Sequence, residues 1–89
     1  MTNPLITRRE KQANDETVLL HIKGRLDMNA LEDFKNIFAD EFDTGNFKIV
    51  LNMSQVNFIV STHLGVITSN YKKAQSAGGD IKFSSLTEE

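Results

Sequence analysis

The sequence predicts one α/β domain, with a mixed β-sheet of about four strands and helices packed against it. Short segments with alternating apolar residues are interspersed with two longer segments whose apolar residues recur every three or four positions. Their order is strand, strand, helix, strand, helix, strand, and each helical connection is long enough for a right-handed parallel crossover. The 89 residues suffice for a single domain, residues 1–89, with one modest core.

The first two predicted strands form an antiparallel hairpin. Residues 5–12 are polar enough for an edge strand, and residues 13–16 have turn-forming side chains. Alternate positions of the segment 17–23 are apolar and predict one buried face: Val18, Leu20 and Ile22.

The next segment predicts a helix that begins near Asn29. Asn29 followed by Glu32 has the spacing of a capping box, in which the two residues satisfy each other's backbone N–H groups. One apolar stripe at spacings of three and four is assigned to the core: Leu31, Phe34, Phe38 and Phe42. Gly45 then supplies the positive φ that commonly ends a helix.

Two more strands are predicted in the second half of the chain. Residues 47–53 have three consecutive apolar residues at their centre, as a strand buried on both faces does. Residues 57–60 lead into the second helix. After that helix and its Gly-Gly stop, Ile81 and Phe83 alternate in a last short strand.

The second helix follows two adjacent hydroxyl residues, Ser61 and Thr62. Either hydroxyl is a good N-cap, so one of them is expected to cap the helix. The buried stripe is predicted from spacings of three, four and three: Leu64, Ile67, Tyr71 and Ala74. Gly65 costs about 1 kcal/mol relative to alanine in a helix, and close packing of the helix on the sheet is the expected reason for it.

Composition excludes several classes of function. The net charge of −2 and the pI near 5.6 argue against nucleic acid as the main partner. There is no cysteine, and His21 and His63 are too few for a metal site without a set of carboxylates. No phosphate-binding glycine loop or supported catalytic triad is present, so neither an enzyme nor a cofactor is predicted. Without a signal peptide or an apolar stretch long enough to cross a membrane, the chain is expected to be cytoplasmic.

Several motifs resemble those of the STAS domain family. GRLD at residues 24–27, LNMSQVNF at 51–58 and STHLGV at 61–66 are similar to its Gly-x-Leu-Asp turn, its strand and its Asp-Ser-Ser/Thr-Gly-Leu-Gly loop. The segment KKAQSAGGDIKF matches the end of the family's helix and its final strand. The resemblance spans residues 5–89 and lacks the family's last helix and short closing strand. Residues 86–89 look like the opening of a further helix, with Thr87 as its cap, so the C-terminus is expected to be truncated.

This resemblance implies an anti-sigma factor antagonist, which binds a serine-kinase anti-sigma factor and so releases the sigma factor. The kinase would phosphorylate Ser61 and end binding, and a phosphatase would restore it. The implied partner surface comprises Asp27, Met28, Val60, Ser61, Thr62 and His63. A homodimer would follow if the missing helix left apolar surface exposed.

Three positions depart from the family pattern and keep a second interpretation open. Val60 stands where the family has an acid before the serine, His63 where it has a glycine, and Asn52 where its strand has an acid. The alternative is a STAS subunit or scaffold that works without phosphorylation, for example in a transporter complex. Under that interpretation Ser61 is only a helix cap.

Overall fold

The computed structural model describes residues 3–13 and 16–84. Its elements in chain order are β1 (Ile6–Lys11), β2 (Val18–Leu26), the short 3-10 helix η1 (Met28–Ala30), α1 (Leu31–Asp43), β3 (Lys48–Ile59), α2 (Ser61–Ser76) and β4 (Asp80–Phe83). The strands form one sheet in the order β1-β2-β3-β4, with β1 antiparallel to β2 and the other pairs parallel. The predicted α/β class, with a mixed sheet of four strands, is confirmed.

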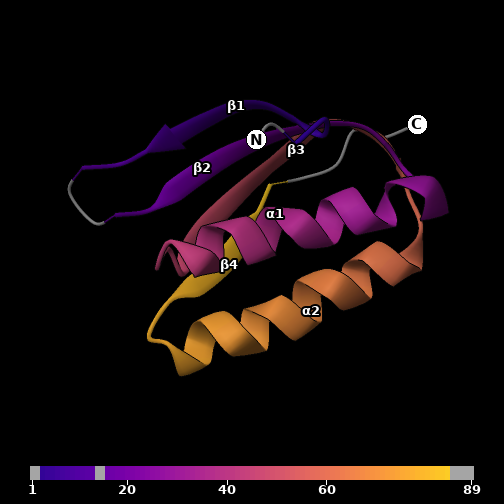
Figure 1. Ribbon diagram of the computed structural model, residues 1–89. Coiled ribbons are helices and arrows are strands. Elements are labelled where there is room, and N and C mark those ends of the chain that lie inside the picture. The colour runs from indigo at the N-terminus through magenta and orange to yellow at the C-terminus, as the bar shows by residue number, and fades with distance from the viewer. Residues whose placement is uncertain (1–2, 14–15, 85–89) are drawn as a thin grey trace.

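Both long helices lie on the same face of the sheet (Figure 1). The core fills the space between them and the sheet. On β2 the predicted alternation holds, because Val18, Leu20 and Ile22 are fully buried. Other strands and the helices supply the remaining buried apolar side chains, which include Phe34, Ile37, Phe38, Ile49, Leu51, Met53, Val56, Ile67, Ala74 and Ile81. One face of the sheet therefore carries the core.

The hairpin between β1 and β2 is closed by a hydrogen bond from the Gln12 N–H to the Thr17 carbonyl, 2.8 Å long. Of the predicted turn at residues 13–16, positions 14 and 15 lie outside the described residues. So do residues 86–89, on which the prediction of a further helix fell.

β3 is longer than predicted and is not buried on both faces. It runs unbroken over 12 residues and includes the stretch 57–59, which the sequence had suggested as a separate approach to the second helix. Ile49 and Leu51 are buried, whereas Val50 between them is only half-buried. The reason is that the helices cover one face of the sheet, so alternate residues of β3 point to the other face.

The predicted capping box at Asn29 is wrong. Asp27 caps the 3-10 helix η1 instead, since its Oδ1 accepts a hydrogen bond of 3.0 Å from the Asn29 N–H. A 3-10 turn follows this cap, and α1 starts at Leu31 without a side-chain cap. At the other end of the helix Gly45 has φ of 83°, as predicted.

The predicted buried stripe of α2 is half correct. Ile67 and Ala74 are buried, but Leu64 and Tyr71 are 43% and 39% exposed. His63, which is fully buried, takes a place in the core that the apolar pattern gave to its neighbour. The packing reason predicted for Gly65 is also wrong, because a Cβ at this position would meet nothing within 4 Å.

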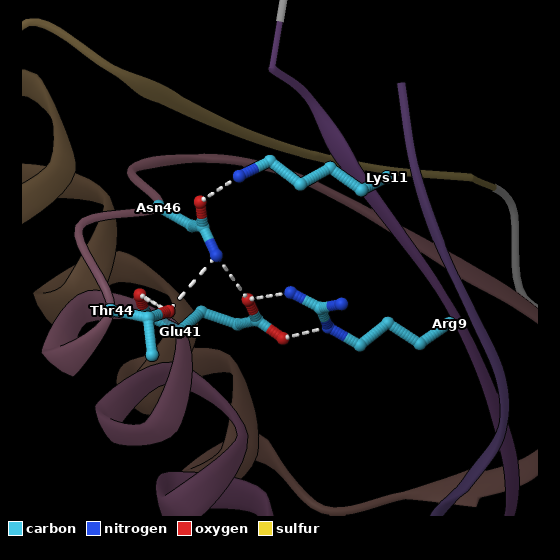
Figure 2. A network of polar contacts seen from close by, with 5 residues as sticks. All are labelled: Arg9, Lys11, Glu41, Thr44 and Asn46. Carbon is cyan, nitrogen blue, oxygen red and sulfur yellow. Dashed lines mark hydrogen bonds and ion pairs between the residues drawn. The ribbon is translucent and has the colours of Figure 1, made fainter. Parts of the chain in front are cut away.

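A network of hydrogen bonds and ion pairs connects β1 to the C-terminal end of α1 (Figure 2). Glu41 is buried, and Arg9 donates to both of its carboxylate oxygens, from Nε at 2.8 Å and from a terminal nitrogen at 3.0 Å. Asn46 donates to the same carboxylate at 3.0 Å and accepts from Lys11 at 2.9 Å. Burial acts to raise the pKa of Glu41, but the hydrogen bonds from Arg9 and Asn46 outweigh it and hold this pKa below its ordinary value.

Within residues 3–13 and 16–84, no helix is both long enough and apolar enough to cross a lipid bilayer.

Candidate functional site

The candidate site lies where β2 and β3 end side by side. Leu26 and Ile59 are paired at the ends of these parallel strands, and the Val60 N–H donates to the Leu26 carbonyl at 3.0 Å. Because parallel strands end at the same edge of a sheet, the Asp27-Met28 turn and the start of α2 emerge together. The topology thus brings together the two segments that the sequence had suggested for one surface.

Ser61 and Thr62 are exposed and form the first turn of α2. The residue at the N-cap position is Val60, which is extended with φ of −91° and ψ of 153° and offers no side-chain hydrogen bond. The prediction that one of the two hydroxyls caps the helix is therefore wrong. In the described part of the chain, neither hydroxyl is engaged in a cap, and the Ser61 hydroxyl is accessible beside the first N–H groups of the helix.

His63 does not reach the surface of the site. Its Nε2 lies 2.7 Å from the Asp27 carbonyl oxygen, which accepts the hydrogen bond, so Nε2 carries the proton. The ring contacts Phe34 at 4.9 Å between centroids, and Nδ1 has no hydrogen-bond partner within the described residues. His63 therefore links the first turn of α2 to the Asp27-Met28 turn on the buried side of the site.

Asp27 and Met28 occupy the other half of the edge. The carboxylate of Asp27 caps η1 and lies 3.8 Å from Arg25 Nε, while the Arg25 guanidinium lies 4.0 Å from the centre of the Phe58 ring. Met28 is 57% exposed, Phe58 39%.

Three surface residues of this edge were missed from the sequence: Arg25, Phe58 and Leu64. Arg25 and Phe58 are neighbours only through the register of β2 on β3, which the sequence does not specify. Leu64 had been placed in the core because its spacing to Ile67 fits a buried stripe. His63 precedes Ile67 by four positions and fits the same stripe, so spacing alone does not decide between His63 and Leu64.

His21 lies on the sheet face away from the helices, in a row of polar contacts. Its Nε2 is 2.9 Å from Glu10 and its Nδ1 accepts from the Asn52 amide at 2.9 Å. The Ser84 hydroxyl is 3.3 Å from the Asn52 Oδ1. Asn52 thus links neighbouring strands through its side chain. Among the residues that the structure describes, no group of three or more His, Asp or Glu side chains is placed to hold a metal ion.

Comparison with known proteins agrees with this geometry. The family model of the STAS domain matches residues 8–89. The chain is similar to a Thermotoga maritima protein described as a candidate anti-sigma factor antagonist, with 31% identity over 85% of this chain and 64% of that chain and a TM-score of 0.74.

Other solved structures share the fold at lower identity. The unphosphorylated anti-sigma factor antagonist SpoIIAA is 21% identical over 85% of this chain and 69% of that chain, with a TM-score of 0.68. SpoIIAA from Bacillus in its phosphorylated form is 20% identical, over 92% and 72%, with a TM-score of 0.64. A protein named Mglu is 21% identical over 91% of this chain, with a TM-score of 0.72. The chain spans only 20% of Mglu and 64% of the Thermotoga protein.

The match to the family model covers nearly the whole chain, and the fold is shared with the solved structures of anti-sigma factor antagonists. The chain belongs to the STAS domain family and is structurally similar to anti-sigma factor antagonists.

Proposed function

We propose that this domain is an anti-sigma factor antagonist. It binds an anti-sigma factor that is a serine kinase, in the cytoplasm, and phosphorylation of Ser61 by that kinase ends the binding. The observation that supports this proposal most is the exposed Ser61 hydroxyl, which occupies the first position of α2 and is not used as a helix cap.

The chemistry of the site suits a phosphoacceptor. Phosphorylation forms a bond between the Ser61 oxygen and the γ-phosphorus of ATP, releases ADP and removes the hydroxyl proton. The product carries about −1.5 to −2 charges and three acceptor oxygens. The free N–H groups and the positive end of the helix dipole stabilise such a group at the start of α2.

The surface around Ser61 suits a protein partner. Three large apolar side chains are exposed here: Met28, Phe58 and Leu64. Met28 follows Asp27 in the chain, and Phe58 stacks with Arg25, which lies 3.8 Å from Asp27. Leu64 follows His63, which donates to the Asp27 carbonyl. Large exposed apolar side chains near polar ones are typical of interfaces. A phosphate in such an interface would add negative charge and lose its hydration, and the resulting cost would release the kinase.

The domain contributes no catalytic group under this proposal. Ser61 is the substrate, the kinase supplies ATP and magnesium, and a separate phosphatase hydrolyses the phosphoserine. Buried His63 then holds the loop. The proposed partner contacts are made by Asp27, Met28, Val60, Ser61 and Thr62.

The test is affinity capture from lysate of the native cell, read by mass spectrometry. The baits are wild type, Ser61→Ala, Ser61→Glu and, as a matched charge control on the same helix, Ser76→Glu. We expect wild type, Ser61→Ala and Ser76→Glu to retain a serine kinase that Ser61→Glu loses. A partner held equally by all four baits, above all a transporter subunit, would favour the phosphorylation-independent role and reject the switch.

A further inference from the structure

A groove of about 480 Å³ runs between α1 and α2, the two helices that lie side by side on the sheet (Figure 1). It starts at Thr62, beside the candidate site, and ends at Lys73 near the end of α2. The α1 side contributes Lys35, Ala39 and Phe42, and the α2 side contributes Thr62, Gly65, Val66, Ser69, Asn70 and Lys73.

The width of the groove comes from small side chains that the fold itself does not require. Ala39, Gly65 and Ser69 are exposed, and a Cβ added to Gly65 would contact nothing within 4 Å. Glycine in a helix costs about 1 kcal/mol relative to alanine, and no contact within residues 3–13 and 16–84 explains the glycine at this position. Space left open at such a cost is available to a molecule from outside.

The charges of the groove have one sign. Among the described residues that line it, the only ionic ones are Lys35 and Lys73, and none is an acid. Within the described residues, neither lysine forms an ion pair. Lys73 lies in the last turn of α2, where a positive charge interacts favourably with the helix dipole. Lys35 lies in the first half of α1, so the dipole does not account for a positive charge there.

The dimensions fit a peptide segment. Thr62 and Lys73 are 11 residues apart on one helix, so the groove is about 16 Å long. About five residues of extended chain, or three turns of helix, span that length. Half-buried Phe42 and Val66 offer apolar contact along it.

We propose that the α1–α2 groove binds an acidic segment of a partner protein. Carboxylates of the segment pair with Lys35 and Lys73, and an apolar side chain between them lies over Ala39 and Gly65. Nucleic acid is not the occupant, because two lysines on a chain of net charge −2 do not provide the basic face that phosphate backbones need. The proposal does not depend on phosphorylation of Ser61.

The test needs no kinase, so its failure is distinct from failure of the proposed function. A phage library of random twelve-residue peptides is selected on the wild-type domain and counter-selected on the double variant Lys35→Glu/Lys73→Glu. We expect acidic sequences with a central apolar residue. One selected peptide is then synthesised, and its affinity is measured by fluorescence anisotropy. Its binding site is mapped on the ¹⁵N-labelled domain by NMR.

The matched variants are Lys73→Glu and Lys72→Glu, which change the same charge on neighbouring residues of α2, of which only Lys73 lines the groove. Lys73→Glu should weaken binding at least tenfold, and Lys72→Glu less than twofold. Gly65→Leu, which fills the groove, should also abolish binding, and urea unfolding checks that each variant is folded. The proposal is overturned if no peptide is enriched, if the winners are neutral or basic, if both lysine variants weaken binding equally, or if the shifted amides lie away from α1 and α2.

Discussion

The glycines at positions 65 and 79 differ in whether their surroundings leave room for a side chain. Gly65 lies in the first turns of α2 with open space around it, whereas a Cβ at Gly79 would overlap the Phe47 carbonyl and approach the Phe47 Cβ to 2.7 Å. Gly65→Ala should therefore stabilise the fold by roughly 0.5–1 kcal/mol, because alanine loses less backbone entropy. Gly79→Ala should destabilise it. Urea unfolding of both variants is the measurement, and a destabilised Gly65→Ala would show that this backbone has another constraint.

His63 stabilises the site through burial and through one hydrogen bond. Removing its ring leaves a void against Phe34 and deletes the donor to the Asp27 carbonyl. We expect His63→Ala to cost about 2–4 kcal/mol, in the range of other large-to-small changes in cores. Thr62→Ala, its exposed neighbour, should change stability by less than about 0.5 kcal/mol. Equal effects of the two changes in urea unfolding would argue against a buried His63.

At the scale of elements, the alternation of apolar residues predicted the buried face of β2 correctly. Val18, Leu20 and Ile22 were placed correctly because strand alternation has a period of two and the sheet has one covered face. Helix starts were less predictable. Asn29 and Ser61 both look like caps, but Asp27 holds the N-cap position of η1 and Val60 that of α2.

Part of the candidate site was predictable from the order of strands and helices. The Asp27-Met28 turn and Ser61 could be placed at one edge from crossover topology alone. The burial of His63 could not, because a histidine after two hydroxyls looks polar, and only the packing of α2 on Phe34 decides its side. The pairing of Arg25 with Phe58 depends on a register shift beside Gly24, and a glycine within a strand does not specify how the register shifts.

The link between β1 and α1 makes stability depend on pH. The pKa of Glu41 is lower in the folded chain than its ordinary value, so the unfolded chain binds this proton more tightly. The contribution is complete above the ordinary glutamate pKa of about 4.3 and is lost as pH falls through the lower folded value. The pKa of Arg9 is raised by its hydrogen bond to Glu41, which has no effect in this range.

Glu41→Gln should therefore lower the free energy of unfolding at pH 7 by about 1–2 kcal/mol, a modest figure because Arg9 remains 45% exposed. It should also reduce the loss of stability that wild type shows as the pH falls below the ordinary glutamate pKa. Asp40→Asn, an exposed neighbour, is the control. Urea unfolding at three pH values measures this, and parallel pH profiles for wild type and Glu41→Gln would contradict it.

For the whole molecule, the arrangement separates the core from the candidate site. The core lies between one face of the sheet and the two helices, whereas Ser61 stands at the edge where β2 and β3 end. Its side chain is exposed and lies outside the hydrophobic core cluster. A charge added there should alter what the surface binds and leave the fold intact, which a reversible switch requires.

Ser61→Glu tests that separation directly. A carboxylate in the first turn of α2 meets the positive end of the helix dipole, so the variant should be as stable as wild type or more stable by about 0.3–1 kcal/mol. The measurements are urea unfolding and amide NMR spectra, in which shifts should be confined to residues near the start of α2 and the Asp27-Met28 turn. A loss of more than about 1 kcal/mol, or shifts spread through β2 and β3, would mean that charge at Ser61 acts by disturbing the fold. Partner release in the capture experiment would then report unfolding and not a surface switch.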